Sequence, residues 1–314
     1  MKKITFSIMS FLFIGFMQLH AQEGEFLRSY TGLKKVNLDI QNGELKVTRS
    51  ISGDLEVHGR FDATRLKIKA DQMGDKLLIK EDNNRLKSNT RSSWTMAVPE
   101  GINVTFNIGA GEVTIEGVNV DLNGNSGGAN VQMNKISGTS NINSGSGNIS
   151  VVDASGIFKI NTGTGDVSCA NSNGSISANT GAGDIYFDRS TGAIEANTGT
   201  GDIKAERVSI HKPSFFNTGT GDVEVTLGSG AKADLKLNSG TGLSSLNFNG
   251  NAFDGTLTMS CDSKKGEIVS PFRFDEERVE EEGGNPVVYK IKRFGDAEVN
   301  IKINAGEKKA IVKK

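Results

Sequence analysis

The segment Asn161-Thr162-Gly163-Thr164-Gly165-Asp166-Val167 sets the architecture of this chain, because close copies of it recur. Three clear copies begin at Asn179, Asn197 and Asn217, and fainter ones begin at Asn107, Asn125, Asn143 and Asn238. The spacing is 18 residues from Asn107 to Asn197, then 20 and 21. A fixed period of this length indicates a stack of equivalent units rather than a globular fold.

One unit, residues 161–178, contains two turn signals and two short alternating segments. Gly163 and Gly165 mark one corner, and the stretch from Asn171 to Gly174 marks the other. Val167 and Cys169 share one face of the segment that follows the first corner. Alternation with a period of two is typical of half-buried strands. Each unit is therefore predicted to be two short strands joined by two tight corners.

Equivalent apolar positions in successive units predict the core. The first inward series is Val113, Val131, Ile149, Val167, Ile185, Ile203 and Val223, and the second is Ile115, Met133, Val151, Cys169, Phe187, Ala205 and Val225. Stacking each strand on its copy gives a parallel, in-register sheet with a strand spacing of about 4.8 Å. We therefore predict an all-β fold, a single-stranded β-helix or solenoid with an 18-residue coil repeat and a narrow core between two walls.

The remainder of the chain is predicted to complete one elongated domain, residues 22–314. Residues 30–100 alternate less regularly and are predicted to form early irregular coils and a cap, because exposed strand edges invite aggregation. Residues 101–245 form the regular coils, and residues 246–314 form the closing coils and a C-terminal cap. The acidic run 275–282 is predicted to be a solvated loop.

Residues 1–21 have the pattern of a bacterial export signal. Lys2 and Lys3 precede an apolar run, and Ala21 provides a small residue for cleavage. That run is too short for a membrane span, and no second apolar stretch reaches the required length. The mature chain is therefore expected in the periplasm, at the outer membrane or outside the cell. The net charge of −1 provides no basic field for nucleic acid.

At the family level, the sequence resembles exported bacterial adhesin-like domains of the toastrack type, and the related autotransporter-head-like adhesin domains. The resemblance rests on the signal-like start, on Val98-Pro99-Glu100-Gly101, on the serial G-x-G-D-[VI] corners and on Phe294-Gly295. It implies a right-handed β-helix that acts at the cell envelope, in surface attachment or envelope-stress sensing. No catalytic residues come with it.

One column of carboxylates is a candidate metal site. Asp166, Asp184, Asp202 and Asp222 occupy equivalent corners on successive coils. Like charges about 4.8 Å apart repel, and Ca²⁺, which takes several oxygen ligands, would relieve the repulsion. The alternative is a set of turn residues that accept hydrogen bonds from nearby backbone amides. No other cofactor is indicated.

Further chemistry is sparse. The mature chain has only His58 and His211, which argues against a zinc site or a Ser/His/Asp triad. Cys169 and Cys261 are predicted to be free buried thiols, because about five coils separate them and a disulfide needs Cα atoms within about 7 Å. Tyr186, between inward Ile185 and Phe187, is expected to face outward.

Two functions remain open at this stage. The first is a non-enzymatic envelope or surface interaction module that binds an unknown protein or glycan through its repeated wall, where the Asn and Thr columns either bind glycan hydroxyls or only support the fold. The alternative is a carbohydrate-active β-helix enzyme or glycan-binding protein. The outward charged residues considered for that alternative are Lys159, Arg189, Glu195, Lys204, Glu206, Arg207, His211 and Lys212.

Overall fold

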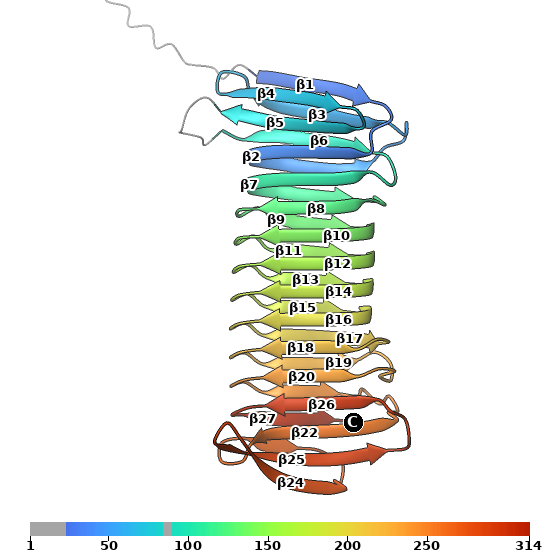
Figure 1. The fold of residues 1–314 in the computed structure, drawn as a ribbon, viewed down its shortest axis with the longest axis vertical. Coiled ribbons are helices and arrows are strands. Elements are labelled where there is room, and N and C mark those ends of the chain that lie inside the picture. The colour runs from blue at the N-terminus through green and yellow to red at the C-terminus, as the bar shows by residue number, and fades with distance from the viewer. Residues whose placement is uncertain (1–22, 84–89) are drawn as a thin grey trace, which may run out of the picture.

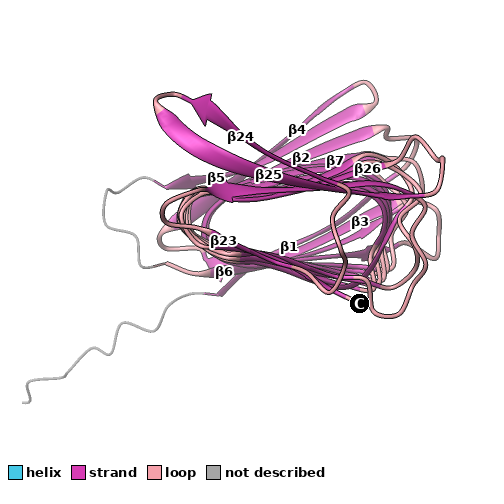
Figure 2. Ribbon diagram, turned by 90° about the horizontal axis from the view of Figure 1, so that it is seen from below, coloured by secondary structure: helices cyan, strands magenta, loops and turns pink. Residues whose placement is uncertain are grey.

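The computed structural model describes residues 23–83 and 90–314, and its 27 strands stack into a long rod (Figure 1). The view along the rod shows two walls facing each other across a flattened cross-section (Figure 2). The predicted all-β solenoid is confirmed. Residues 1–21, the predicted export signal, lie outside the described residues. Among the described residues, no helix has the length and apolarity that a membrane crossing requires.

The regular coils alternate between two walls. The front wall, which faces the viewer in Figure 1, contains β8 (Asp121–Ser126), β10 (Ser137–Ser144), β12 (Ser155–Thr162), β14 (Asn173–Thr180), β16 (Thr191–Thr198), β18 (Ser214–Thr218) and β20 (Leu235–Ser239). The rear wall contains β9 (Asn130–Asn134), β11 (Ile149–Val152), β13 (Val167–Ala170), β15 (Ile185–Asp188), β17 (Ile203–Ile210), β19 (Val223–Leu227) and β21 (Ser244–Asn247). Every strand pairs in parallel with its equivalents in the adjacent coils.

Strand register places identical positions directly above one another. Asn161 pairs with Asn143 on one side and with Asn179 on the other. Val167 pairs with Ile149 and Ile185 in the same manner. Both predicted inward series lie in the core, where their exposed fractions are 2% or less. The predicted register of the two walls is confirmed.

At the N-terminal end, the chain leaves its first coil and returns to it. The opening strands are β1 (Glu23–Tyr30), β2 (Lys35–Arg49), β3 (Leu55–Asp62), β4 (Leu66–Met73), β5 (Lys76–Asn83), β6 (Ser92–Val98) and β7 (Asn103–Glu116). β2 and β7 each run through both walls and pair in parallel. β5 and β6 cover the other side of β2, and antiparallel β4, β3 and β1 follow them outward. The stack therefore ends in antiparallel strands.

The C-terminal end uses a similar detour. Its strands are β22 (Gly255–Asp262), β23 (Glu267–Val269), β24 (Glu276–Glu282), β25 (Asn285–Phe294), β26 (Asn300–Ala305) and β27 (Lys309–Lys313). β26 lies between β20 and β22, and β27 lies between β21 and β23. The last residues of the chain thus form an inner coil, and the antiparallel strands β25 and β24 lie outside it.

Two details of the end regions differ from the sequence-based interpretation. Most of the acidic run 275–282 is the edge strand β24 rather than a loop, and five of its seven residues are Glu. Charged side chains on an edge strand discourage pairing with another chain. Within the predicted early coils of residues 30–100, Leu55–Asp62 is the antiparallel strand β3 and not part of a parallel coil. Its apolar alternation suits a half-buried strand of either direction.

The second corner of each coil contains a non-glycine residue in the left-handed backbone conformation, which was not predicted from the sequence. Lys135, Asp153, Asn171, Arg189 and Arg207 recur every 18 residues with φ between 45° and 53°. Gly174, three residues after Asn171, has a φ of 134°, and a Cβ there would lie 2.0 Å from the carbonyl oxygen of Gly156. Close coil stacking therefore excludes larger residues at the glycine.

Replacing Gly183 with alanine is expected to destabilise the rod. A Cβ at Gly183 would lie 2.0 Å from the carbonyl oxygen of Gly165 in the preceding coil. Gly183→Ala should lower the free energy of unfolding by about 1–3 kcal/mol, because the backbone must shift. Thr164→Ala is the matched control, since Ala182 already occupies the equivalent corner position. Equal melting temperatures for the two variants would contradict the stacking argument.

The two cysteines are free and buried, as predicted. Cys169 stacks between Val151 and Phe187, and burial raises the pKa of its thiol to about 12. Burial also raises the pKa of the Cys261 thiol. Neither thiol is expected to react with a thiol reagent in the native protein at neutral pH, because the thiolate is the reactive form.

Mass spectrometry of native and urea-unfolded protein measures this reactivity. Two modifications are expected after unfolding and none before it. A Cys169–Cys261 crosslink in a non-reduced peptide map would contradict the register of the coils.

Candidate interaction surface of the solenoid

A buried hydroxyl ties each first corner to the coil before it. The Thr180 hydroxyl accepts a hydrogen bond from the Gly183 amide at 3.1 Å and donates to the carbonyl oxygen of Gly165 at 2.9 Å. Thr162, Thr198, Thr218 and Ser239 make the same pair of bonds. The Thr side chains in the second position of the repeated phrase are therefore structural.

The four predicted metal-ligating aspartates form a single column, and each is bonded to the next coil. Oδ1 of Asp166 accepts a hydrogen bond from the backbone amide of Asp184 at 2.9 Å. Oδ1 of Asp184 and of Asp202 accept from the amides of Asp202 and Asp222, both at 2.8 Å. In the described residues, no three His, Cys, Asp or Glu side chains converge as a metal site. Calcium binding stays a prediction.

Asparagine continues this column toward the N-terminal end. Oδ1 of Asn130 accepts from the amide of Asn148, and Oδ1 of Asn148 accepts from the amide of Asp166. At the other end, Oδ1 of Asp222 accepts from the amide of Leu243 at 2.9 Å. Because an amide oxygen performs the same task as a carboxylate oxygen, the negative charge is not needed for this bond.

The leading asparagines form a hydrogen-bonded ladder along the outer face of the front wall. Each side-chain amide donates to the carbonyl oxygen of the asparagine in the preceding coil, at 2.6–3.3 Å. One run joins Asn107, Asn125, Asn143, Asn161, Asn179 and Asn197, and a second joins Asn217, Asn238 and Asn304. All donors point toward the N-terminal end, so the ladder has a direction.

Both ends of the ladder carry groups that match this direction. At the N-terminal end, Asn107 donates to the carboxylate of Asp39 at 2.6 Å. At the other end, the Ser260 hydroxyl donates to Oδ1 of Asn304 at 3.3 Å. Asp39 can only accept when ionised, and the hydroxyl of Ser260 can donate. The ladder is thus completed at both ends.

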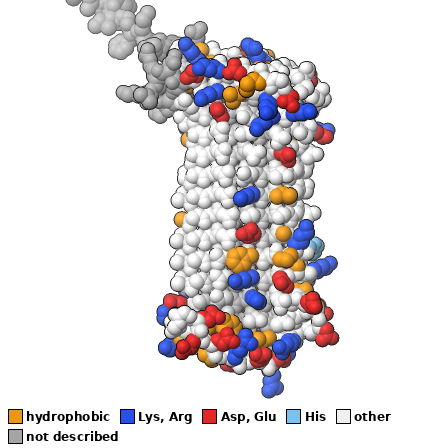
Figure 3. Space-filling model, viewed as in Figure 1, with side chains coloured by type: hydrophobic (Ala, Val, Ile, Leu, Met, Phe, Trp, Pro, Cys, Tyr) orange, Lys and Arg blue, Asp and Glu red, His pale blue; other side chains and the backbone are white. Residues whose placement is uncertain are grey.

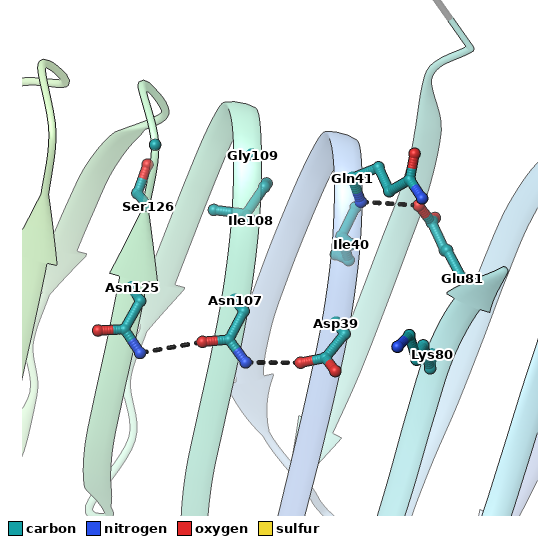
Figure 4. Close-up of a pocket in the computed structure, with 11 residues that line it drawn as sticks. Asp39, Ile40, Gln41, Lys80, Glu81, Asn107, Ile108, Gly109, Asn125 and Ser126 are labelled. Carbon is teal, nitrogen blue, oxygen red and sulfur yellow. Dashed lines mark hydrogen bonds between the residues drawn. The ribbon is translucent and has the colours of Figure 1, made fainter. Parts of the chain in front are cut away.

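A hollow of about 450 Å³ lies where the ladder begins (Figure 4). Asp39, Asn107 and Asn125 point into one side of it, and Lys80 lies beside Asp39 on the paired strand. Glu81, 2% exposed, accepts hydrogen bonds from the Trp94 indole at 2.8 Å and from the Gln41 amide at 2.9 Å. Both carboxylate oxygens of Glu81 therefore hold the fold together.

Several of the charged residues considered for an enzyme meet on the rear wall. Lys204 pairs with Glu206 at 2.8 Å, and the Tyr186 hydroxyl donates to the same carboxylate at 2.9 Å. These bonds lower the pKa of Glu206, while burial and the bond to Glu206 raise the pKa of Tyr186. Tyr186 faces outward, as predicted, and its side chain is half-buried. The pairing keeps Glu206 ionised and Tyr186 protonated.

Two arginines extend this rear-wall cluster at the second corner. Arg189 pairs with Asp188 at 2.8 Å, and Arg207 pairs with the other oxygen of the same carboxylate. Asp188 is buried, whereas both guanidinium groups are about half exposed. One buried carboxylate therefore pairs with both arginines.

The remaining charged candidates lie elsewhere. Lys159 and Glu195 are on the outer face of the front wall. His211 and Lys212 occupy the corner between β17 and β18, where their backbone amides donate to the carbonyl oxygen of Gly192. The structure thus divides the eight predicted residues among the rear wall, the front wall and one corner.

A second hollow, of about 370 Å³, lies on the front wall near the C-terminal end. Phe215, Lys236 and Lys302 line it, with Glu195 and Asp234. Phe215 was not among the residues that the sequence singled out. The adjacent pair Phe215-Phe216 was the available signal, because alternation requires one of the two rings to face outward.

The sequence matches the profile of the Toastrack DUF4097 family over residues 61–255, more than half of the chain. The chain belongs to this family. The Toastrack match runs from the end of β3 to the start of β22 and includes all the regular coils. The relation to autotransporter-head-like domains stays a prediction.

Solved structures resembling this Toastrack chain share little sequence with it. A candidate cell adhesion protein from Clostridium sporogenes is 13% identical, with 93% of this chain and 99% of that one covered and a TM-score of 0.27. A candidate adhesin from Bacteroides fragilis is 12% identical (93% and 98% covered, TM-score 0.30). A candidate lipid binding protein from Parabacteroides distasonis is 14% identical (91% and 96% covered, TM-score 0.34). No curated protein matches the sequence.

Asp184 provides a test of the two roles considered for the aspartate column. Asp184→Ala should lower the free energy of unfolding by about 1 kcal/mol, because the Asp202 amide loses its acceptor. Asp184→Asn should leave the stability near that of the parent, since asparagine serves at Asn148. If the column binds calcium, millimolar Ca²⁺ raises the melting temperature of the parent and raises it less in Asp184→Asn. Identical melting temperatures in Ca²⁺ and in EDTA would remove the calcium hypothesis.

Proposed function

We propose that this protein is an exported, non-enzymatic interaction module of the cell envelope or cell surface, which binds an extended partner along the solenoid wall. The observation that supports this proposal most strongly is the front-wall ladder, in which equivalent amides are held at every coil. Weak contacts to such a wall add by avidity when the partner also repeats.

Rigidity of the wall strengthens the proposal. Three kinds of hydrogen bond link each coil to the next near the same corner. They are made by the threonine hydroxyl, the aspartate carboxylate and the asparagine side-chain amide. A partner that binds a preformed surface does not need to order it, so less binding free energy is lost. The module is therefore suited to attachment.

A carbohydrate-active enzyme is the second candidate, and the rear-wall cluster of Tyr186, Lys204, Glu206, Arg189 and Arg207 is the observation that favours it. Lysine, tyrosine and carboxylates are residue types that act in general acid–base catalysis, and arginine can bind an acidic sugar. However, Lys204 is paired with Glu206, and both arginines are paired with Asp188. General acid–base chemistry needs a group free to exchange a proton. The arrangement therefore favours the scaffold.

Fractionation and protease shaving of intact producing cells test the proposed function. We expect the protein in the envelope or external fraction and its digestion by protease added to intact cells. The purified protein should bind isolated envelopes saturably. Complete protection in intact cells would count against surface attachment and favour a periplasmic role.

The enzyme alternative has its own readout. Purified protein is incubated with neutral and acidic polysaccharides, and new reducing or unsaturated ends are measured. No increase above a no-protein control is expected. Cleavage that disappears in Tyr186→Phe or Arg207→Gln would establish the alternative.

A further inference from the structure

The front wall carries one irregular band on an otherwise uniform polar face. Charged and hydrophobic side chains gather in a band parallel to the long axis, beside a broad polar area (Figure 3). One column of this band, two residues before the asparagine ladder, contains Lys159, Ser177, Glu195, Phe215, Lys236 and Lys302 in successive register. We call its five charged and aromatic residues the front-wall column.

Two lysines of the front-wall column are neighbours on adjacent strands. Lys236 and Lys302 are register partners on β20 and β26, at the strand spacing of about 4.8 Å. Like charges directly opposite one another on a sheet are destabilising. Within residues 23–83 and 90–314, no carboxylate forms an ion pair with either lysine; the contact of Lys236 is the ring of Phe215, 5.3 Å from Nζ to the centroid. A bound anion would relieve this repulsion.

The carboxylates of the hollow are already engaged with the protein. Glu195 accepts hydrogen bonds from the Ser177 hydroxyl at 3.3 Å and from the Asn197 side-chain amide at 3.2 Å. Asp234 accepts from the backbone amide of Asn300 at 2.8 Å. Each carboxylate retains acceptor capacity, because it has about four lone-pair sites. These sites suit hydroxyl donors and disfavour a densely charged polyanion.

The neighbouring ladder adds further hydrogen-bonding groups. Asn217 accepts one hydrogen bond from Asn238, and Asn238 and Asn304 each donate one hydrogen bond and accept one. An amide group has two N–H donors and two oxygen lone pairs, so capacity remains on the outward side. Phe215, which is half-buried, adds an apolar surface beside these groups.

From this arrangement we infer that the hollow at Phe215, Lys236 and Lys302 is a binding site for an acidic polysaccharide. The two lysines bind sugar carboxylates, Glu195 and Asp234 accept sugar hydroxyls, and Phe215 contacts a ring face. Nucleic acid, with one charge per about 1.7 Å of duplex, meets the two carboxylates unfavourably. An extended peptide would need a free sheet edge for backbone pairing, and this site is on a sheet face. The inference rests on the proposed function and specifies its ligand class.

The probe for this site is polygalacturonate, and the control ligand is the same polymer after methyl esterification, which removes the carboxylate charges. Titration calorimetry with the full chain should show binding to polygalacturonate that weakens as salt increases. Esterification should weaken binding at least about fivefold, since each exposed charge pair contributes modestly.

Lys236→Gln/Lys302→Gln is the decisive variant, and an about five- to tenfold loss of affinity is expected. Lys46→Gln/Lys135→Gln is the matched control, because it removes the same charge from exposed positions outside the front-wall face and should bind like the parent. Phe215→Ser, which places the residue of Ser177 in the same column, should cost about fivefold in affinity. Thermal melting verifies that all variants are folded.

Unchanged affinity in Lys236→Gln/Lys302→Gln would overturn the assigned site. Equal or tighter binding of DNA or polyglutamate would overturn the ligand class. A parent protein that binds no acidic polysaccharide but still attaches to cell envelopes would overturn this inference and leave the proposed function intact. A parent protein that binds neither would overturn both.

Discussion

Exact repetition of side-chain position along the axis is the condition on which every other feature of this rod rests. When Asn161 lies between Asn143 and Asn179, each amide finds a donor on one side and an acceptor on the other. The aspartates and the corner glycines lie against their equivalents for the same reason, and each threonine hydroxyl reaches a glycine carbonyl of the preceding coil. In-register amide stacking is also what stabilises cross-β assemblies. Here it is confined within one chain.

At the two ends of the stacked coils, the hydrogen-bonding groups that would pair with a further coil need other partners. The asparagine ladder stops at Asp39, an acceptor, and at Ser260, a donor. The backbone pairing ends in another way. At both ends of the rod it changes from parallel to antiparallel before the edge strand. In both cases the chain travels past a coil and then returns inside it. The glutamates of β24 then protect an edge that would otherwise be free to pair.

The regular and irregular parts of the surface have different roles. The repeated corner groups are largely occupied in holding coils together, since Thr180 and Asp184 both bond to adjacent coils. Charged and aromatic side chains of the front wall are concentrated near the two-residue insertion between Asn197 and Asn217. Phe215 lies shortly after that insertion, and Lys236 is its register partner in the next coil. The hollow at Phe215 and Lys236 thus combines irregular charged groups with the regular ladder of the same wall.

Much of the architecture was predictable from local patterns. The period placed the corners, the alternation identified the inward residues such as Val167 and Cys169, and the distance along the axis kept the two thiols apart. These features depend on short segments that repeat, so a single chain contains several independent copies of the same signal. The accepting role of the Asp corner was also foreseen as one alternative.

Other features depended on contacts between distant segments. No local signal places residues 300–313 inside residues 255–269, or joins Lys236 to Lys302 across 66 positions, because chain returns leave no period in the sequence. The pairing of Arg207 with Asp188 similarly required the actual path of the second corner. Repetition in the sequence therefore specified the coil and its core, whereas the ends and the irregular surface were specified by which non-equivalent segments stack together in three dimensions.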